Sequence, residues 1–168
     1  MHRFVADAVG FIATGLFIYS SSLTDDKKLS FFYTIGCFLL AAHLFLMGSM
    51  YAGAVTTLSG IRNMVAPFDK TGLVKKLFMM IFIGLLAYTL VESSDLVDII
   101  PALSSAIMSY AFLYTKNNAL SFCIFVSASL WFVVAISIGS VPMMVLEAAT
   151  IATLTYRVFK SNFAGATA

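Results

Sequence analysis

The sequence predicts an all-α membrane protein with seven transmembrane helices, arranged as two parallel triple-helix bundles joined by a linker helix (3+1+3). Three observations support this fold class. First, 61% of the 168 residues are hydrophobic, only 11% are charged, and the mean hydropathy is +0.97, whereas soluble domains carry about 25% charged residues. Second, the apolar residues form continuous runs rather than alternating patterns, which favours helices over strands. Third, the sequence repeats itself approximately after 91 residues.

The first three runs form one trio of helices. Arg3 ahead of the first run and the serines at 20–22 behind it resemble parts of a signal peptide, but Asp7 early in the run argues against cleavage. The second run follows a charged stretch at 24–28, and the third follows a short turn at Gly48-Ser49. These separators are turn and charge signals. The predicted helices are 4–22, 29–48 and 52–67.

The fourth run is short and is bounded by charged residues at 69–76 and 92–95. The last three runs form a second trio, with a break at 116–118 and a short turn at Gly139-Ser140. A membrane span needs about 20 apolar residues, with shorter ones tolerated. The predicted helices are 77–91, 97–115, 119–138 and 141–159.

The repeat relates the two trios. A shift of 91 residues places Leu29-Ser30-Phe31 on Leu120-Ser121-Phe122, and Gly48-Ser49 on Gly139-Ser140. Because one helix separates the trios, both have the same orientation, which is typical of parallel repeats about an axis along the membrane normal. The predicted domains are a first bundle at 1–67, a linker with the fourth helix at 68–96, a second bundle at 97–160 and a tail at 161–168.

Lysine and arginine predict the orientation. With seven spans, the side that carries the N-terminus holds Arg3, whereas the other side collects most of the cations: Lys27, Lys28, Lys70, Lys75, Lys76, Lys116, Arg157 and Lys160. Cytoplasmic loops are enriched in lysine and arginine. We therefore expect a multi-pass protein of a cytoplasmic membrane, with its N-terminus outside and its C-terminus in the cytoplasm.

Polar side chains inside the predicted spans are the candidate site residues, because ionisable groups in a membrane are costly and usually face a cavity or a partner. Glu147 fits either a substrate or proton site or a protonated, hydrogen-bonded group. His43 fits either a hydrogen-bonded packing residue or the partner of Glu147. Arg62 either extends along its stem to the cytoplasmic surface or points inward and holds an anionic group.

Two further features belong to the same hypothesis. Thr56, Ser59 and Asn63 recur at spacings of three and four, so that one face of the third helix is polar and should face the bundle interior. Trp131 fits either interior packing or stacking on a solute. The predicted substrate-binding or pore-lining set is therefore His43, Thr56, Ser59, Arg62, Asn63, Trp131 and Glu147.

Other chemistry finds no support in the pattern. Cys37 and Cys123 lie at different depths and suit buried apolar positions rather than a disulfide. We find no motif for a catalytic site, a metal ion, a phosphate or a cofactor, and no basic stripe for nucleic acid. The expected partners are a small-molecule solute and membrane lipid, and the sequence leaves a homo-oligomer open.

A resemblance to a known family adds to this interpretation. His43-Leu-Phe-Leu-Met-Gly48, Ala52-Gly53-Ala54 and Ile61-Arg62, followed by Trp131, Gly139-Ser140 and Glu147, resemble the YgjV-type bacterial inner membrane proteins over residues 10–159. The resemblance implies the architecture of SWEET, PQ-loop and PnuC transporters, in which a linker helix joins two triple-helix bundles. It implies no substrate.

This sequence also departs from those patterns. It has no Pro-Gln pair, Val134 stands at the repeat position of His43, and Ser59 replaces an asparagine of the relatives. From these observations we expect a small-solute transporter or facilitator of SWEET-like architecture rather than an enzyme, with its site between the bundles. The alternative is a non-transporting integral membrane protein, such as a receptor, chaperone or partner subunit. A water-accessible polar interior would distinguish the transporter from a scaffold packed with leucine and phenylalanine.

Overall fold

The computed structural model describes residues 2–21, 23, 26–69, 71–93, 95–115 and 117–165. This part of the chain is built from seven α-helices and one short 3₁₀ turn, and it contains no strand. The predicted all-α fold is therefore confirmed. The elements are α1 (His2–Ser21), α2 (Asp26–Leu46), α3 (Met50–Val65), η1 (Ala66–Phe68), α4 (Leu73–Glu92), α5 (Leu96–Tyr114), α6 (Asn117–Ile138) and α7 (Val141–Gly165).

The helices differ in how well they suit a membrane. Four helical segments of the described residues are long and apolar enough to cross one: His2–Ser20, Lys28–Leu46, Leu73–Glu92 and Ala119–Ile138. Helices α5 and α7 contain shorter apolar stretches, at Val97–Ala111 and Val141–Tyr156. Large apolar side chains such as Phe4 and Val91 are exposed, as expected for surfaces that contact lipid rather than water.

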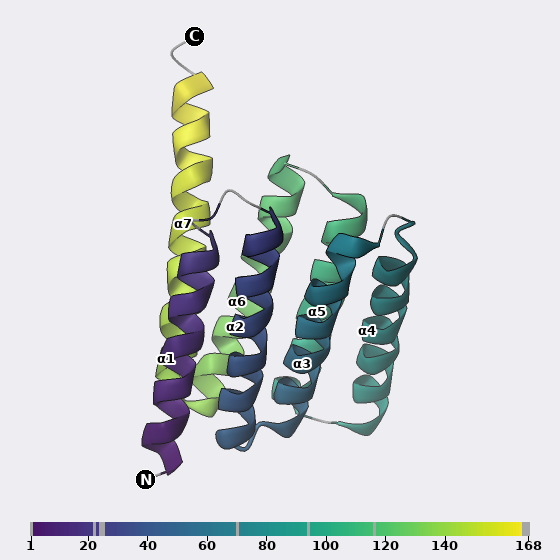
Figure 1. Cartoon of the computed structure of the whole chain (residues 1–168), viewed down its shortest axis with the longest axis vertical. Coiled ribbons are helices and arrows are strands. Elements are labelled where there is room, and N and C mark those ends of the chain that lie inside the picture. Colours follow the sequence, from purple (N-terminus) through teal and green to yellow (C-terminus); the bar gives the residue numbers. More distant parts are fainter. Residues whose placement is uncertain are drawn as a thin grey trace.

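The helices form two layers (Figure 1). Helices α1, α2 and α3 lie side by side with α4 at the edge, and α5, α6 and α7 lie behind them. Consecutive helices pack against each other, although α3 and α4 touch only lightly. The layers also meet at two seams, one between α1 and α7 and one between α3 and α5. We call α1–α3 the first trio and α5–α7 the second trio.

The chain runs alternately up and down through these layers (Figure 1). Helix α1 starts at one end of the bundle, which we call the N-terminal end, and the α2–α3, α4–α5 and α6–α7 connections lie at the same end. The α1–α2, α3–α4 and α5–α6 connections lie at the opposite end, the C-terminal end. Corresponding helices of the two trios therefore run in the same direction.

The two short turns at the N-terminal end have the same backbone geometry. Gly48 and Gly139 both adopt positive φ, 82° and 67°, a region that glycine enters without a steric penalty. The amide of Ser49 donates to Leu44 O, and the amide of Ser140 donates to Ala135 O, both at 2.9 Å. These are the helix-ending bonds of a Schellman motif, and the two turns are 91 residues apart.

The helix limits differ from the predicted ones where side chains cap the backbone. Helix α4 begins at Leu73 rather than residue 77, because the Asp69 carboxylate accepts bonds from the amides of Val74 and Lys75 at 2.7 and 3.4 Å. The start of α5 is capped in the same way by Asp95, which accepts from the amide of Val97. Pro101 lies inside α5.

The far end of α7 also differs from the prediction. This helix continues to Gly165, past the expected end at residue 159. Residues 166–168 of the predicted tail lie outside the described residues.

An apolar cluster fills the space between the layers towards the N-terminal end. Its buried members come from both trios: Ala13, Phe17, Cys37, Leu40, Leu44, Ala52, Val134, Ala135 and Met143. Trp131 packs against this cluster. A smaller cluster of Val55, Phe78 and Phe82 joins α3 to α4. The first cluster determines which polar groups of the interior can reach one another.

Candidate functional site

The α1–α7 seam is held by His43, which is fully buried. Its Nδ1 lies 2.7 Å from Ala6 O, and its Nε2 lies 2.7 Å from Ser140 Oγ. Because a carbonyl oxygen only accepts, Nδ1 donates to Ala6 O, and Nε2 forms a hydrogen bond with the serine hydroxyl. His43 on α2 thus links α1 to the start of α7, and both ring nitrogens are engaged.

Close backbone approach makes this seam tight. A Cβ atom on Gly10 would lie 2.9 Å from His43 Nδ1 and 2.9 Å from Pro142 Cβ. The Thr14 hydroxyl, one turn further along α1, donates to Pro142 O at 3.1 Å. At the end of the seam, the Arg3 guanidinium donates to Gly139 O at 3.1 Å. Four groups along α1 and α2 therefore fasten α7.

The α3–α5 seam carries Arg62, which is buried with 7% of its surface exposed. Its Nη1 donates to Ser109 Oγ at 2.7 Å, and its Nε and Nη2 both donate to Asn63 Oδ1 at 3.3 Å. The guanidinium also lies over the Phe82 ring of α4, 5.6 Å from its centroid. Of the two alternatives open from the sequence, the inward-pointing one describes Arg62.

The polar face of α3 extends this contact. Asn63 Nδ2 donates to Cys37 Sγ on α2 at 3.7 Å, and Ser30 Oγ donates to Asn63 O at 2.9 Å. Ser59 Oγ lies 3.4 Å from Ser105 Oγ on α5. Thr56 is buried and donates to Ala52 O within its own helix. Helix α3 therefore presents polar groups to both α2 and α5.

Glu147 lies on the interior side of α7. The buried residues Met143 and Leu154 are four positions before and seven positions after it, on the same helix face. Its carboxylate makes no hydrogen bond or ion pair with the part of the chain that the structure describes. No hydrogen bond or ion pair among the described residues joins Glu147 to Arg62, which bonds Ser109 and Asn63 instead.

The seven predicted site residues therefore fall into separate groups. Arg62 and Asn63 bond to each other, and Ser59 lies on the same seam. His43 lies at the opposite seam, and neither of its ring nitrogens bonds Glu147. Trp131 packs on the apolar cluster rather than among the polar groups. By the helical rise of 1.5 Å per residue, Arg62 lies roughly 18 Å from the start of α3, deeper than Glu147 at roughly 9 Å from the start of α7.

Two sets of residues were missed in the sequence. Ser105 and Ser109 look like ordinary small membrane residues, and the four-residue spacing of the serines indicated only close packing. The second set lines a pocket of about 470 Å³ at the N-terminal end. We call it the end pocket; it is formed by residues 47–51 with Asp98 and Ile138.

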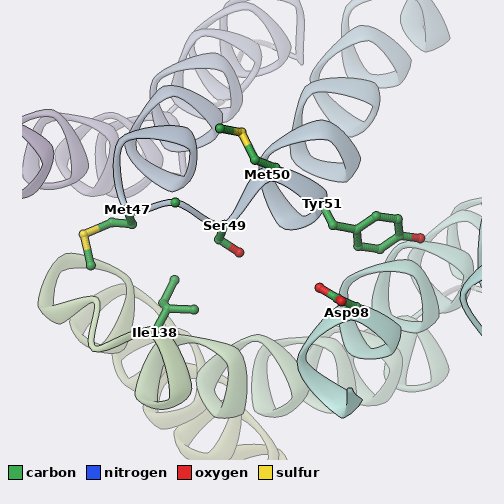
Figure 2. A pocket seen from close by; sticks show the side chains of 7 residues that line it. Met47, Ser49, Met50, Tyr51, Asp98 and Ile138 are labelled. Atoms are coloured by element: carbon green, nitrogen blue, oxygen red, sulfur yellow. The ribbon is translucent and has the colours of Figure 1, made fainter. Parts of the chain in front are cut away.

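Figure 2 shows how this end pocket is built. The turn between α2 and α3 forms one wall, and the first turns of α5 and the last turn of α6 form the other, so that the pocket lies between the two trios. The side chains of Ser49, Asp98 and Ile138 point into it. A signal was present in the sequence, because Asp98 is the counterpart of Asp7 at a shift of 91 residues.

Among the described residues, no group of three or more histidine, cysteine, aspartate or glutamate side chains is placed to hold a metal ion. Cys37 and Cys123 are free thiols. The charged groups of the interior that could meet a solute are the buried Arg62 guanidinium on α3, the Glu147 carboxylate on α7, and the Asp98 carboxylate in the end pocket.

The comparisons with known proteins give one match. The model of a family named Imp-YgjV, described as "Bacterial inner membrane protein", matches residues 4–164. No curated protein and no solved structure matches the chain.

Proposed function

The chain belongs to the Imp-YgjV family of bacterial inner membrane proteins, and from this premise we propose that it is a small-solute transporter or facilitator. In this proposal the first and second trios are the two bundles of a SWEET-like carrier, α4 is the linker, and the solute site lies between the trios. The N-terminal end faces the periplasm and the C-terminal end faces the cytoplasm. The protein acts as a carrier and not as an enzyme.

The observation that carries this proposal is the end pocket. Its two walls come from different trios, and its volume of about 470 Å³ lies within the range of about 300–1,000 Å³ for small-molecule sites. A cavity between two bundles at one end of a membrane protein is what alternating access requires. The shared geometry of the turns at Gly48 and Gly139 supports a repeat, and repeats are common in such carriers.

The polar groups beyond the apolar cluster support a second part of the proposal. Arg62, Asn63 and Glu147 lie deeper in the interior than the end pocket, and membrane interiors keep ionisable groups mainly at functional places. We assign them to a central solute site. Leu44, Val134 and Met143 belong to the apolar cluster that packs between the two trios, so a transport cycle has to separate them.

The same apolar cluster favours the alternative of a non-transporting membrane component. A receptor, chaperone or partner subunit needs no path, and its interior can stay packed with leucine, valine and methionine at this level. The two candidates differ in one physical respect. A carrier lets a solute cross the bilayer, whereas a packed scaffold does not.

Two measurements test the proposal, and neither requires the substrate to be identified first. The first is a thermal-stability screen of the purified protein against metabolites, because a ligand that binds the folded state raises the melting temperature. The second is the osmotic response of proteoliposomes, followed by stopped-flow light scattering with a panel of small solutes. The expected result is a stabilising solute that also enters the vesicles faster than in protein-free liposomes. If no solute of the panel raises the melting temperature and none enters the vesicles faster than in protein-free liposomes, the carrier proposal is wrong.

The orientation has its own test. A reporter fused to the C-terminus should be active if it requires the cytoplasm and inactive if it requires the periplasm. The opposite pattern would reverse the proposed orientation and leave the carrier proposal standing.

A further inference from the structure

The end pocket holds an acidic group that the protein itself leaves partly unused. Oδ2 of Asp98 accepts a hydrogen bond from Ser93 Oγ at 3.1 Å, which orients the carboxylate. Its other oxygen, Oδ1, makes no hydrogen bond with the residues that the structure describes. Asp98 points into the pocket opposite Ser49 (Figure 2). A carboxylate oxygen is therefore available to a ligand.

The α1–α7 seam shows what occupies the equivalent place in the other half of the repeat. Subtracting 91 converts Asp98 to Asp7, and adding 91 converts Gly48 to Gly139. At that seam the guanidinium of Arg3 lies on Gly139 O, with 3.1 Å between Nη2 and the carbonyl oxygen. In that half of the repeat a cation of the chain therefore lies on the glycine carbonyl of the turn, whereas Asp7 Oδ1 is buried without a hydrogen-bond partner among the described residues.

At the end pocket the corresponding cation is missing from the sequence. The counterpart of Arg3 is Ser94, and the counterpart of His43 is Val134. Arg3 and His43 fasten the α1–α7 seam, and the repeat has no arginine or histidine at the corresponding sequence positions. The α3–α5 seam opens at this end into a pocket of about 470 Å³.

The charge at the N-terminal end points in the same direction. Glu92, Asp95 and Asp98 lie in or beside the α4–α5 connection. Among the described arginines and lysines, Arg3 is the one at this end, and it already bonds Gly139 O. Asp98 is the charged residue among those that line the pocket, and a cleft that carries one sign of charge raises the local concentration of the opposite ion. Cations are therefore favoured over anions at this pocket.

We propose that the end pocket binds a small organic cation, a guanidinium or primary ammonium group on a short apolar stem. The Asp98 carboxylate is its counter-ion, Ser49 Oγ and Gly48 O accept its N–H groups, and Ile138 and Met47 contact the stem. The volume suits such a molecule rather than a bare monovalent ion. The inference rests on the proposed function in one respect: it names the charge of the solute that the carrier takes up.

The test uses n-butylguanidinium, with n-butylurea as a neutral probe of nearly the same shape. Thermal unfolding of the purified full-length protein is recorded at increasing probe concentration and constant ionic strength. We expect a saturable rise in melting temperature with n-butylguanidinium and none with n-butylurea. Asp98→Asn should weaken binding by about ten- to hundredfold, because it removes a charge-assisted hydrogen bond.

Two further variants keep the result interpretable. Asp7→Asn, the repeat counterpart, should bind n-butylguanidinium as the unmodified protein does. Ile138→Trp should block binding by filling the pocket while leaving the carboxylate in place, and it serves if Asp98→Asn does not fold. Equal stabilisation by both probes, or binding that persists in Asp98→Asn or Ile138→Trp, would overturn the inference.

The outcome is separable from that of the proposed function. If solutes enter the proteoliposomes but n-butylguanidinium does not bind, the carrier proposal is supported and the cation-binding pocket is rejected. If n-butylguanidinium binds through Asp98 but no solute enters, the cation-binding pocket is supported and the carrier proposal is rejected.

Discussion

Nε2 of His43 lies 2.7 Å from Oγ of Ser140, and this bond joins two residues that are 97 positions apart in the sequence. The other ring nitrogen bonds Ala6 O. One imidazole therefore connects three helices at the N-terminal end of the bundle. Its loss should lower the stability of the protein more than it affects any binding site.

Replacing His43 by alanine should lower the free energy of unfolding by about 3 kcal/mol, because it removes two buried hydrogen bonds and leaves a cavity. Thermal unfolding in detergent measures the change. His2→Ala is the matched control, since His2 is exposed at the start of α1 and should change stability by less than about 0.5 kcal/mol. Equal effects of the two variants would contradict the assigned role.

Gly10→Ala should destabilise the protein by about 1–3 kcal/mol. The added methyl group would lie 2.9 Å from both His43 and Pro142, and overpacking of this kind forces neighbours to shift. Gly15→Ala on the same helix meets nothing within 4 Å and should be neutral or stabilising by up to about 1 kcal/mol. If Gly10→Ala and Gly15→Ala change the melting temperature equally, the prediction is wrong.

Arg62→Lys should keep a positive charge at the α3–α5 seam but lose the forked bonds to Ser109 and Asn63, since lysine lacks the planar guanidinium. We expect a loss of about 1–2 kcal/mol in stability, with Arg62→Ala more severe. Lys27→Ala, near the start of α2, should have little effect. The measurements are the melting temperature and solute permeation in proteoliposomes. If Lys27→Ala changes them as much as the Arg62 variants do, the assigned role of Arg62 at the α3–α5 seam is wrong.

Glu147→Gln should alter solute permeation, or its pH dependence, while leaving the melting temperature nearly unchanged. The reason is that the Glu147 carboxylate makes no hydrogen bond or ion pair with the described chain, so neutralising it breaks none of the described contacts. Glu92→Gln at the exposed end of α4 is the control. Stopped-flow permeation of both variants between pH 5 and 8 would reveal the difference, and identical profiles would remove Glu147 from the path.

The start of α4 should loosen in acid. Bonds from the Thr71 hydroxyl and from the amides of Val74, Thr71 and Lys75 hold the pKa of the Asp69 carboxyl below its ordinary value of 3.8. A depressed folded pKa means that the capping contribution is present above the unfolded value and is lost as pH falls through the folded pKa. The hydrogen-exchange protection factors of Val74 and Lys75 should therefore fall below about pH 4, and in Asp69→Ala these amides should show low protection at every pH.

Much of the fold could be predicted because lipid imposes one rule on every span. Backbone groups must be satisfied inside each segment, so that long apolar runs become helices regardless of their neighbours. The turns at Gly48 and Gly139 were also readable, because glycine before a new apolar run indicates a helix end. The start of α4 and the end of α7 were misplaced, because charged residues such as Lys75 and Lys76 join a helix once a cap supports them.

The site was harder to predict for a geometric reason. Polarity predicted an inward face of α3 that includes Asn63 and left two orientations open for Arg62. The partners of His43 include the backbone carbonyl of Ala6, which no side-chain pattern can mark. Helix rotation and the offset between layers decide that His43 meets Ser140 and not Glu147.

The unequal seams have a mechanical consequence. Three hydrogen bonds, made by Arg3, Thr14 and His43, join α1 and α2 to the start of α7 at the N-terminal end, whereas the α3–α5 seam is parted there by the end pocket. A motion that preserves the His43 bonds would turn the second trio about the α1–α7 seam and would have to break the Arg62–Ser109 bond across the α3–α5 seam. The start of α5, which also packs against α4, would then move relative to the α2–α3 turn, and the distance between Ser49 and Asp98 would measure the opening.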